Sequence, residues 1–108
     1  MPFDGSNYDA PVKNPVTELL EQAWRLIDKP QKWCRGQPEA ADGRRLCSLA
    51  AVQTTAWRDG LSPENHVRAL STLSLAMGGN IMGFNDCSSH REVAAAWQRA
   101  IAASRNHG

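Results

Sequence analysis

Hydrophobic residues recur every three or four positions in four segments of the chain, which is the spacing of one face of an α-helix. In the first segment, Asn14 is a helix-capping residue and Pro15 suits the first helical turn, while Pro30 cannot continue a helix. The apolar positions between them are Val16, Leu19, Leu20, Ala23, Trp24 and Ile27. We therefore expect one amphipathic helix between Asn14 and Pro30.

Two further amphipathic segments follow in the middle of the chain. One covers about residues 45–58 and is followed by Gly60, a residue that commonly ends helices. The next opens with Ser62-Pro63-Glu64, which provides a cap, a first-turn proline and a first-turn acid, and it stops at Gly78-Gly79. The positions expected to face the core are Leu46, Leu49, Ala50, Ala56, Trp57, Val67, Leu70, Leu73, Ala76 and Met77.

A fourth helix is expected to begin near Ser89, because Glu92 lies three residues later and completes a capping box. Its inward positions are Val93, Trp97, Ala100 and Ile101. The apolar segment 81–84 is too short for its period to be measured, and we expect either a buried loop or a brief strand there. Together the patterns predict an all-α fold, a compact bundle of about four helices with Trp24, Trp57 and Trp97 in its core.

The connection between the first two helices is long. Residues 29–44 contain the helix-breaking residues Pro30, Gly36, Pro38 and Gly43. We expect a structured loop with a turn at Asp42-Gly43, and Trp33 should fold it back onto the helices because an indole resists full exposure. Before the first helix, residues 1–13 are mostly polar and are expected to form an extended or mobile arm, which leaves residues 14–108 as a single helical domain.

Charge and targeting patterns narrow the class of protein. The chain has 108 residues, with 12 Lys and Arg against 11 Asp and Glu, and a net charge of +1. Such a balance gives no strong positive field, so nucleic acid is not an expected partner. We find no apolar run that could span a membrane and no secretory signal. The three cysteines are too few and uneven for a disulfide framework, and we expect reduced thiols in a cytoplasmic protein.

Cys47 is the one candidate nucleophile. It lies near the start of a predicted helix and follows Arg44 and Arg45, an arrangement that stabilises a thiolate. A cysteine enzyme also needs a base, and no spacing links His66 or His90 to Cys47. We therefore favour a small buried thiol and keep the cysteine enzyme as an alternative.

The pair Cys87 and His90 has the two-residue spacing seen in zinc sites. Cys34 and Cys47 could complete a set of four ligands, but they lack the tight spacing of a second pair. We expect neither a metal site nor a cofactor.

Asn85 and Asp86 are candidate binding residues, together with three residues of the long loop. Trp33 is expected to bring the loop back to the helices, and Arg44 or Arg45 is expected to pair with Asp86. We predict that residues 33–45 dock against Asn85-Asp86. The ion pair either only holds the loop or leaves guanidinium donors for a ligand or a partner.

Several of these sequence stretches resemble the sequence pattern of a known protein family. The chain resembles a family of small uncharacterised proteins of bacteria and their phages, which shares the pattern carried by the first helix, Trp33-Cys34-Arg35-Gly36, residues 42–51, Phe84-Asn85-Asp86 and the helix around Glu92-Val93. The family pattern has Trp in place of Phe84, Gly in place of Ala50 and no cysteine in place of Cys87. The resemblance implies a compact helical domain in a phage or mobile-element context, and it assigns no activity.

The sequence contains no phosphate-binding loop, no catalytic pair of acids and no triad. The leading hypothesis is therefore a non-catalytic binding or interaction protein, whose partner is another protein or a second copy of the chain. Two alternatives remain: a small enzyme that uses Cys47, and a small-molecule or nucleotide binder with a pocket between residues 33–45 and Asn85-Asp86.

Overall fold

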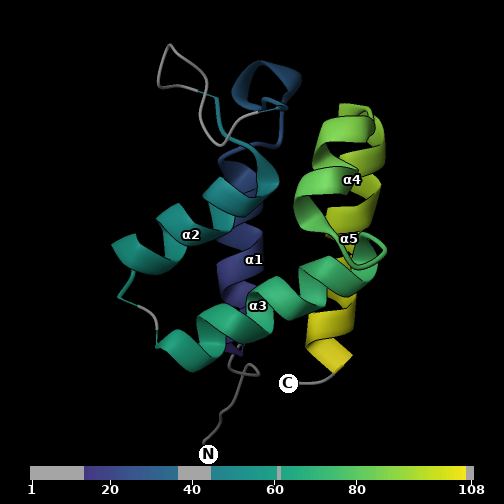
Figure 1. Ribbon diagram of the computed structural model, residues 1–108. Coiled ribbons are helices and arrows are strands. Elements are labelled where there is room, and N and C mark those ends of the chain that lie inside the picture. The colour runs from purple at the N-terminus through teal and green to yellow at the C-terminus, as the bar shows by residue number, and fades with distance from the viewer. Residues whose placement is uncertain (1–13, 37–44, 61, 107–108) are drawn as a thin grey trace, which may run out of the picture.

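The computed structural model describes residues 14–36, 45–60 and 62–106, and within these residues the fold is all-α (Figure 1). The elements are α1 (Pro15–Arg25), a short 3-10 turn η1 (Pro30–Lys32), α2 (Ser48–Arg58), α3 (Pro63–Ala76), α4 (Ile81–Cys87) and α5 (His90–Asn106). Five α-helices therefore stand where about four were expected. The predicted arm at 1–13 and the predicted turn at Asp42-Gly43 lie outside the described residues.

Helix starts follow the capping residues that the sequence indicates. The Asn14 side-chain oxygen accepts a hydrogen bond from the Thr17 N–H at 2.8 Å, and Pro15 occupies the first turn of α1. Before α5 the predicted capping box is formed: Ser89 N–H donates to Glu92 at 2.8 Å, and Glu92 N–H donates to the Ser89 hydroxyl at 3.1 Å. These bonds satisfy amide groups that a helix N-terminus otherwise leaves without a partner.

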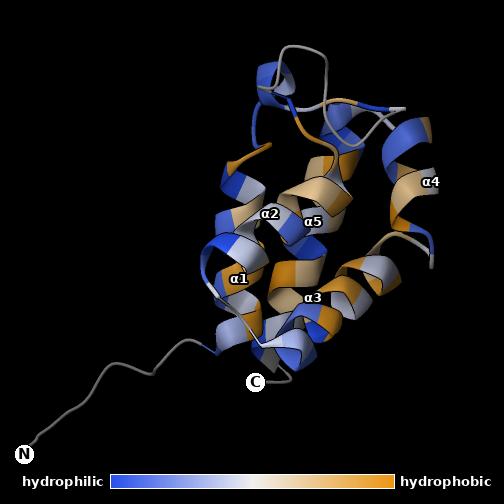
Figure 2. Ribbon diagram, turned by 60° about the vertical axis from the view of Figure 1, so that its left-hand side comes forward, coloured by the Kyte–Doolittle hydropathy of each residue, from blue (hydrophilic) through white to orange (hydrophobic). Residues whose placement is uncertain are grey.

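The core lies between α1, α2, α3 and α5. Helices α1 and α5 are antiparallel, because Asn14 at the start of α1 donates to the Ser104 carbonyl at 3.0 Å and His90 at the start of α5 bonds the Ile27 carbonyl at 2.8 Å. Helix α3 crosses both, and hydrophobic segments of α1 and α5 meet at the centre of the molecule (Figures 1 and 2). The large side chains with under 2 % exposure are Leu19, Leu20, Ile27, Val52, Leu73, Val93 and Trp97.

The segment 81–84 is neither a loop nor a strand, and this prediction was wrong. It is the first part of α4, whose start is capped by the Asn80 side chain accepting from the Gly83 N–H at 2.9 Å. The helix has only seven residues and includes Gly83, a weak helix former. A helix of two turns does not repeat its apolar face often enough to show a period in the sequence.

Two predicted core positions are on the surface. Trp57 is 74 % exposed and Val67 is 60 % exposed, so both predictions were wrong. Helix α2 directs Ala51, Val52, Thr55 and Ala56 inward, which leaves Trp57 on its solvent side. The indole of Trp24 packs against the core without being fully buried, whereas Trp97 is completely buried as predicted.

Candidate functional site

Residues 33–36 of the long loop lie against the end of α4, as the sequence predicts. A bridge between Trp33 and Leu46 holds the two ends of the loop together, with the Cys34 N–H donating to the Leu46 carbonyl and the Leu46 N–H to the Lys32 carbonyl, both at 3.0 Å. Because Leu46 is engaged in this bridge, α2 begins at Ser48 rather than near residue 45. We call the contact between residues 33–36 and Asn85-Asp86 the seam.

Asn85 is the centre of the seam, and its side chain is completely buried. Its oxygen accepts from the Trp33 indole N–H at 2.8 Å, the Ser48 N–H at 3.0 Å and the Ser48 hydroxyl at 2.8 Å. Its amide nitrogen donates to the Cys34 carbonyl at 3.1 Å. An asparagine so fully bonded inside the protein fixes three chain segments relative to one another.

The network continues from Asn85 to the core. The Ser48 hydroxyl, which donates to Asn85, also accepts from the indole N–H of Trp97 at 3.1 Å. Both residues are completely buried. The seam is thus connected through hydrogen bonds to α5, and its order depends on the packing of the whole helical core.

His90 also belongs to this part of the structure, which the sequence reasoning missed. Its ring stacks on Trp24 with centroids 5.7 Å apart and meets Trp33 edge-on at 5.4 Å. Nε2 of His90 is the ring atom that bonds the Ile27 carbonyl. The only signal in the sequence is a histidine at the first turn of a helix, which by position alone resembles an ordinary surface residue.

Asp86 holds the loop through the backbone rather than through a described ion pair. Its Oδ1 accepts from the Gly36 N–H at 2.8 Å and from the Asn85 amide at 3.3 Å. Arg44 lies outside the described residues, and none of the ion pairs found among the described residues joins Arg45 to Asp86. The arginine that does reach this end of α4 is Arg35, whose guanidinium donates to the Ser88 carbonyl at 3.2 Å and lies 5.6 Å from the Trp33 ring centroid.

Cys47 is a capping residue inside the protein. Its sulfur accepts from the Ala50 N–H at 3.4 Å, lies 3.9 Å from the Met82 sulfur and has no exposed surface. No hydrogen bond of the described residues joins this thiol to a histidine. Cys47 offers a substrate no exposed surface, so the geometry gives the cysteine-enzyme alternative no support.

The cysteines and histidines do not converge either. Cys34 and Cys47 are buried while Cys87 is exposed, and the structure shows no disulfide among the three. Within residues 14–36, 45–60 and 62–106, no group of three His, Cys, Asp or Glu side chains could hold a metal ion.

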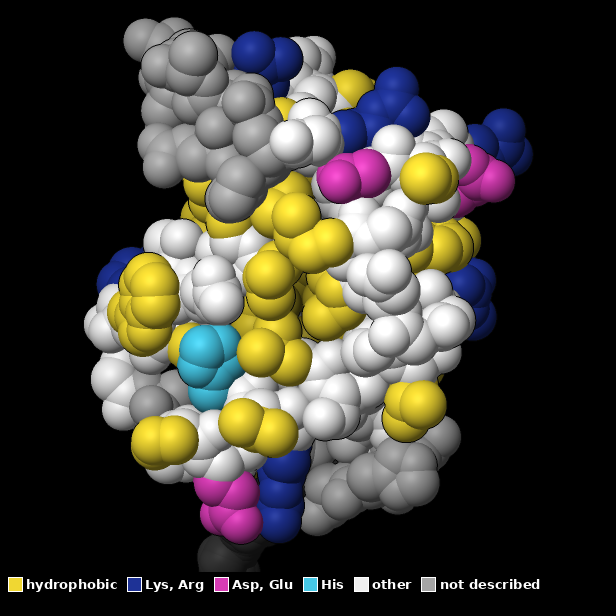
Figure 3. Space-filling model, in the orientation of Figure 1, with side chains coloured by type: hydrophobic (Ala, Val, Ile, Leu, Met, Phe, Trp, Pro, Cys, Tyr) yellow, Lys and Arg dark blue, Asp and Glu magenta, His cyan; other side chains and the backbone are white. Residues whose placement is uncertain are grey.

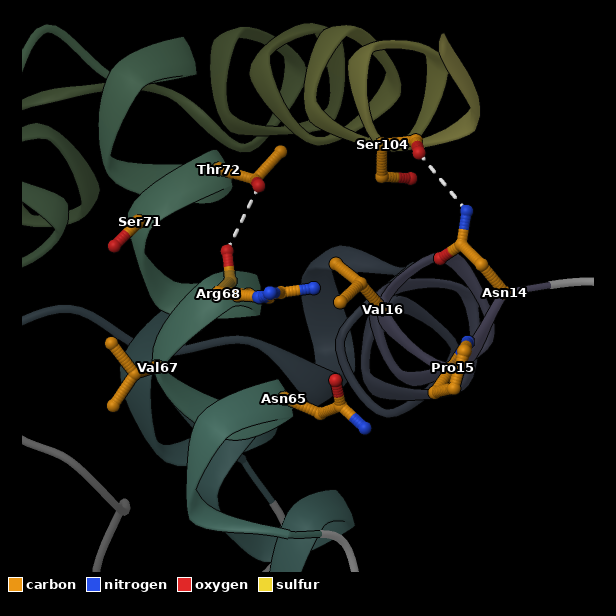
Figure 4. Close-up of a pocket in the computed structure, with 9 residues that line it drawn as sticks. All are labelled: Asn14, Pro15, Val16, Asn65, Val67, Arg68, Ser71, Thr72 and Ser104. Atoms are coloured by element: carbon orange, nitrogen blue, oxygen red, sulfur yellow. Dashed lines mark hydrogen bonds between the residues drawn. The ribbon is translucent and has the colours of Figure 1, made fainter. Parts of the chain in front are cut away.

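A pocket of about 540 Å³ opens between the start of α1, the middle of α3 and the end of α5, away from the seam (Figure 4). Most of its polar groups already bond within the protein. Asn14 bonds Thr17 and Ser104, the Thr72 hydroxyl donates to the Arg68 carbonyl at 2.8 Å, and Arg68 lies 3.5 Å from Glu64. A ligand would find few unsatisfied groups in this pocket, which lies apart from the pocket expected between residues 33–45 and Asn85-Asp86.

A second hollow, of about 610 Å³, is apolar and lies between α2, α3 and α4. Figure 3 shows hydrophobic side chains gathered around a depression on this face. It is lined by Leu49, Val67, Leu70, Ser71, Ser74, Leu75, Gly79, Asn80, Ile81 and Met82, none of which is charged. We call this hollow and its lining the α3 groove.

Large hydrophobic side chains project from the same part of the surface. Leu75 is 82 % exposed and Val67 is 60 % exposed, and both line the α3 groove. Trp57 lies on α2 two turns after Leu49, another lining residue, and is 74 % exposed. Clustered exposed apolar side chains beside a groove are typical of a protein-binding surface.

The fold and the seam define a small all-α protein in which a buried polar network connects the loop to the helices. The chain belongs to a family of unknown function, DUF6197, whose model matches residues 11–103. Searches of the curated proteins and of the solved structures found no match. No helix in the described part of the chain has the length and apolarity needed to cross a membrane.

Proposed function

We propose that this protein is a non-catalytic protein-binding domain and that the α3 groove is its binding surface. The observation that carries the proposal is the exposure of Leu75 and Val67 beside an uncharged groove. Exposed apolar area costs free energy in water, at roughly 25 cal/mol per Å², and a partner that covers it recovers this free energy. A single exposed apolar side chain is ordinary, but Val67 and Leu75 lie on one helix and line the same groove.

The seam has a positioning role in this proposal. Trp33, Asn85 and Asp86, which the sequence marks as candidate binding residues, direct their described hydrogen bonds to one another and to their neighbours. Asn85 fixes α4 against the start of α2, and these two helices contribute Leu49, Ile81 and Met82 to the lining of the α3 groove. The buried network therefore supports the groove without itself contacting a partner.

We also propose a cytoplasmic location and a bacterial or phage context. The first rests on the sparse, odd set of three cysteines. The second rests on the resemblance of the motifs around Trp33, Cys47 and Asn85 to those of small bacterial and phage proteins.

Site-specific photocrosslinking tests the proposal. A benzophenone amino acid placed at Leu75 should give discrete protein adducts in the source cells, because Leu75 lies in the groove and faces solvent. The matched control is the same amino acid at Gln98, an exposed position of α5 outside the groove. Adducts at Leu75 that exceed those at Gln98 support the proposal. Equal or absent crosslinking at the two positions would refute it.

A further inference from the structure

The geometry points to the pocket between α1, α3 and α5 as a binding site for a small organic carboxylate, held by Arg68 and Asn65. This site goes beyond the proposed function, because it takes a small molecule and lies apart from the seam. It is carried by the lining of the pocket, which combines one positive charge, a side-chain amide and an apolar wall (Figure 4).

The pocket has the size of a small-molecule site, and its available polar groups come from α3. Its volume of about 540 Å³ lies within the range of about 300–1,000 Å³ that is typical of ligand pockets. On the α1 and α5 walls the polar side chains are already engaged: Asn14 bonds Thr17 and Ser104, and the Ser104 hydroxyl bonds Thr17. A ligand is therefore held by the side chains of α3.

Arg68 is the only charged residue among the described residues that line the pocket. Its guanidinium carries five N–H donors, and its contact with the Glu64 carboxylate is 3.5 Å long. Charge-assisted hydrogen bonds are about 2.7–2.9 Å long, and the two side chains are 66 % and 74 % exposed, so Glu64 holds the guanidinium weakly. A carboxylate in the pocket can therefore replace Glu64 as its partner.

Asn65 provides a second donor beside Arg68, since residues three apart lie on the same side of a helix. Its backbone N–H bonds the Ser62 hydroxyl, but none of the hydrogen bonds found among the described residues involves its side-chain amide. Figure 4 shows both side chains leaving α3 toward the start of α1. Together they direct N–H donors and a positive charge into one space, which suits the two oxygens of a carboxylate.

The wall on α1 favours an organic carboxylate over an inorganic anion. Val16 lies beside the end of the Arg68 side chain, and Pro15 extends the same wall (Figure 4). A ligand with an apolar body covers these side chains and removes their surface from water, which inorganic phosphate does not do. The single guanidinium also balances the single charge of one carboxylate. The ligand class is therefore a monocarboxylate with an apolar body.

Nuclear magnetic resonance titration of the isotope-labelled protein tests the site. The probes are benzoate and hexanoate, with the neutral benzamide and hexanamide as controls of matched shape and inorganic phosphate as a second anion. The two carboxylates should shift the backbone signals of Val16 and Arg68 and the side-chain amide signal of Asn65, with a dissociation constant below about 1 mM. The amides and phosphate should bind at least about tenfold more weakly, since they lack the charge or the apolar body.

Variants then assign the binding to Arg68. Arg68→Gln should weaken benzoate binding by about tenfold or more, because it removes the charged donor. The matched control is Arg58→Gln, an exposed arginine of α2 outside the pocket, which should bind benzoate like the wild type. Glu64→Gln should bind benzoate at least as tightly as the wild type, because it removes the competing carboxylate. Both arginines are exposed, so circular dichroism should be unchanged in these variants.

Three results would overturn the inference. They are an absence of shifts at the pocket with both carboxylates, binding of phosphate or the amides as tight as that of the carboxylates, and equal benzoate affinities of Arg68→Gln and Arg58→Gln. Each is independent of crosslinking at Leu75, so the carboxylate site and the protein-binding groove stand or fall separately.

Discussion

The indole N–H of Trp33 donates a 2.8 Å hydrogen bond to the side-chain oxygen of Asn85, 52 residues further along the chain. The same oxygen accepts two bonds from Ser48, so one acceptor joins the long loop, the start of α2 and α4. Loop closure over tens of residues costs conformational entropy, so this contact depends on the packing of the surrounding helices to offset that cost.

Removing the Asn85 side chain should therefore destabilise the whole protein. Asn85→Ala leaves the Trp33 indole N–H, the Ser48 N–H and the Cys34 carbonyl without their partner in a buried site. Each buried unsatisfied group costs about 1–3 kcal/mol, and relaxation of the exposed loop reduces the sum, so we expect a loss of about 3 kcal/mol in the free energy of unfolding. Urea denaturation measures it, with Asn65→Ala on α3 as a control. A loss below about 1 kcal/mol, the range of surface substitutions, would contradict a central role for Asn85.

Truncation to alanine should lower the free energy of unfolding much more at Trp97 than at Trp57. Trp97 is completely buried, and Trp97→Ala is expected to cost about 3–5 kcal/mol through lost burial and a residual cavity. Trp57 is 74 % exposed, and Trp57→Ala is expected to change the free energy of unfolding by less than about 1 kcal/mol. Thermal or urea unfolding of the two variants side by side distinguishes the positions. Similar losses would mean that α2 is rotated relative to the arrangement described.

The contrast between these tryptophans shows what the sequence can predict. The starts of α1, α3 and α5 were predictable because capping depends on neighbouring residues: Asn14, Ser62 and Ser89 each accept a hydrogen bond from an amide three residues later. The inward face of α2 was not predictable from the sequence, because it includes the small residues Ala51 and Ala56. The indole of Trp57 is more hydrophobic than either alanine, so the hydrophobic pattern places Trp57 on the inward face.

For the candidate site, the sequence predicted which segments meet but not all of the contacts between them. The length of the loop and its Trp33 predicted that it folds back onto Asn85 and Asp86, and residues 33–36 do so. The hydrogen bond from the backbone N–H of Gly36 to Asp86 was not predictable, because charge alone points to an arginine as the partner of an aspartate. The exposure of Val67 escaped prediction, since this residue looks like a core residue until the other face of α3 is known to be buried.

The capping box before α5 should make stability depend on pH in the acidic range. Hydrogen bonds from the Ser89 backbone N–H, and then from its side chain, lower the pKa of Glu92 below its ordinary value. A carboxyl with a lowered folded-state pKa stabilises the protein above its unfolded value of about 4.3, and this contribution is lost as the pH falls through the folded pKa. Wild-type protein should thus have a higher melting temperature than Glu92→Ala at neutral pH, and this difference in melting temperature should disappear in acid. Glu18→Ala, at an exposed position of α1, is the control. A gap that persists unchanged in acid would contradict the charged capping box.

The thiols should differ in reactivity, which also tests the cysteine-enzyme alternative. Cys87 is exposed, so a thiol reagent should modify it at once in the native protein. Cys34 is 7 % exposed and Cys47 is completely buried, so both should react only as the protein opens, at rates that rise with urea in parallel with unfolding. Alkylation followed by mass spectrometry identifies each modified cysteine, and full modification in denaturant should find all three.

An enzyme that used Cys47 would need this thiol to react in the folded state faster than Cys87, since a catalytic thiolate is more nucleophilic than an ordinary surface thiol at neutral pH. Native labelling of Cys87 with slow labelling of Cys47 would therefore argue against that alternative, and the reverse order would revive it.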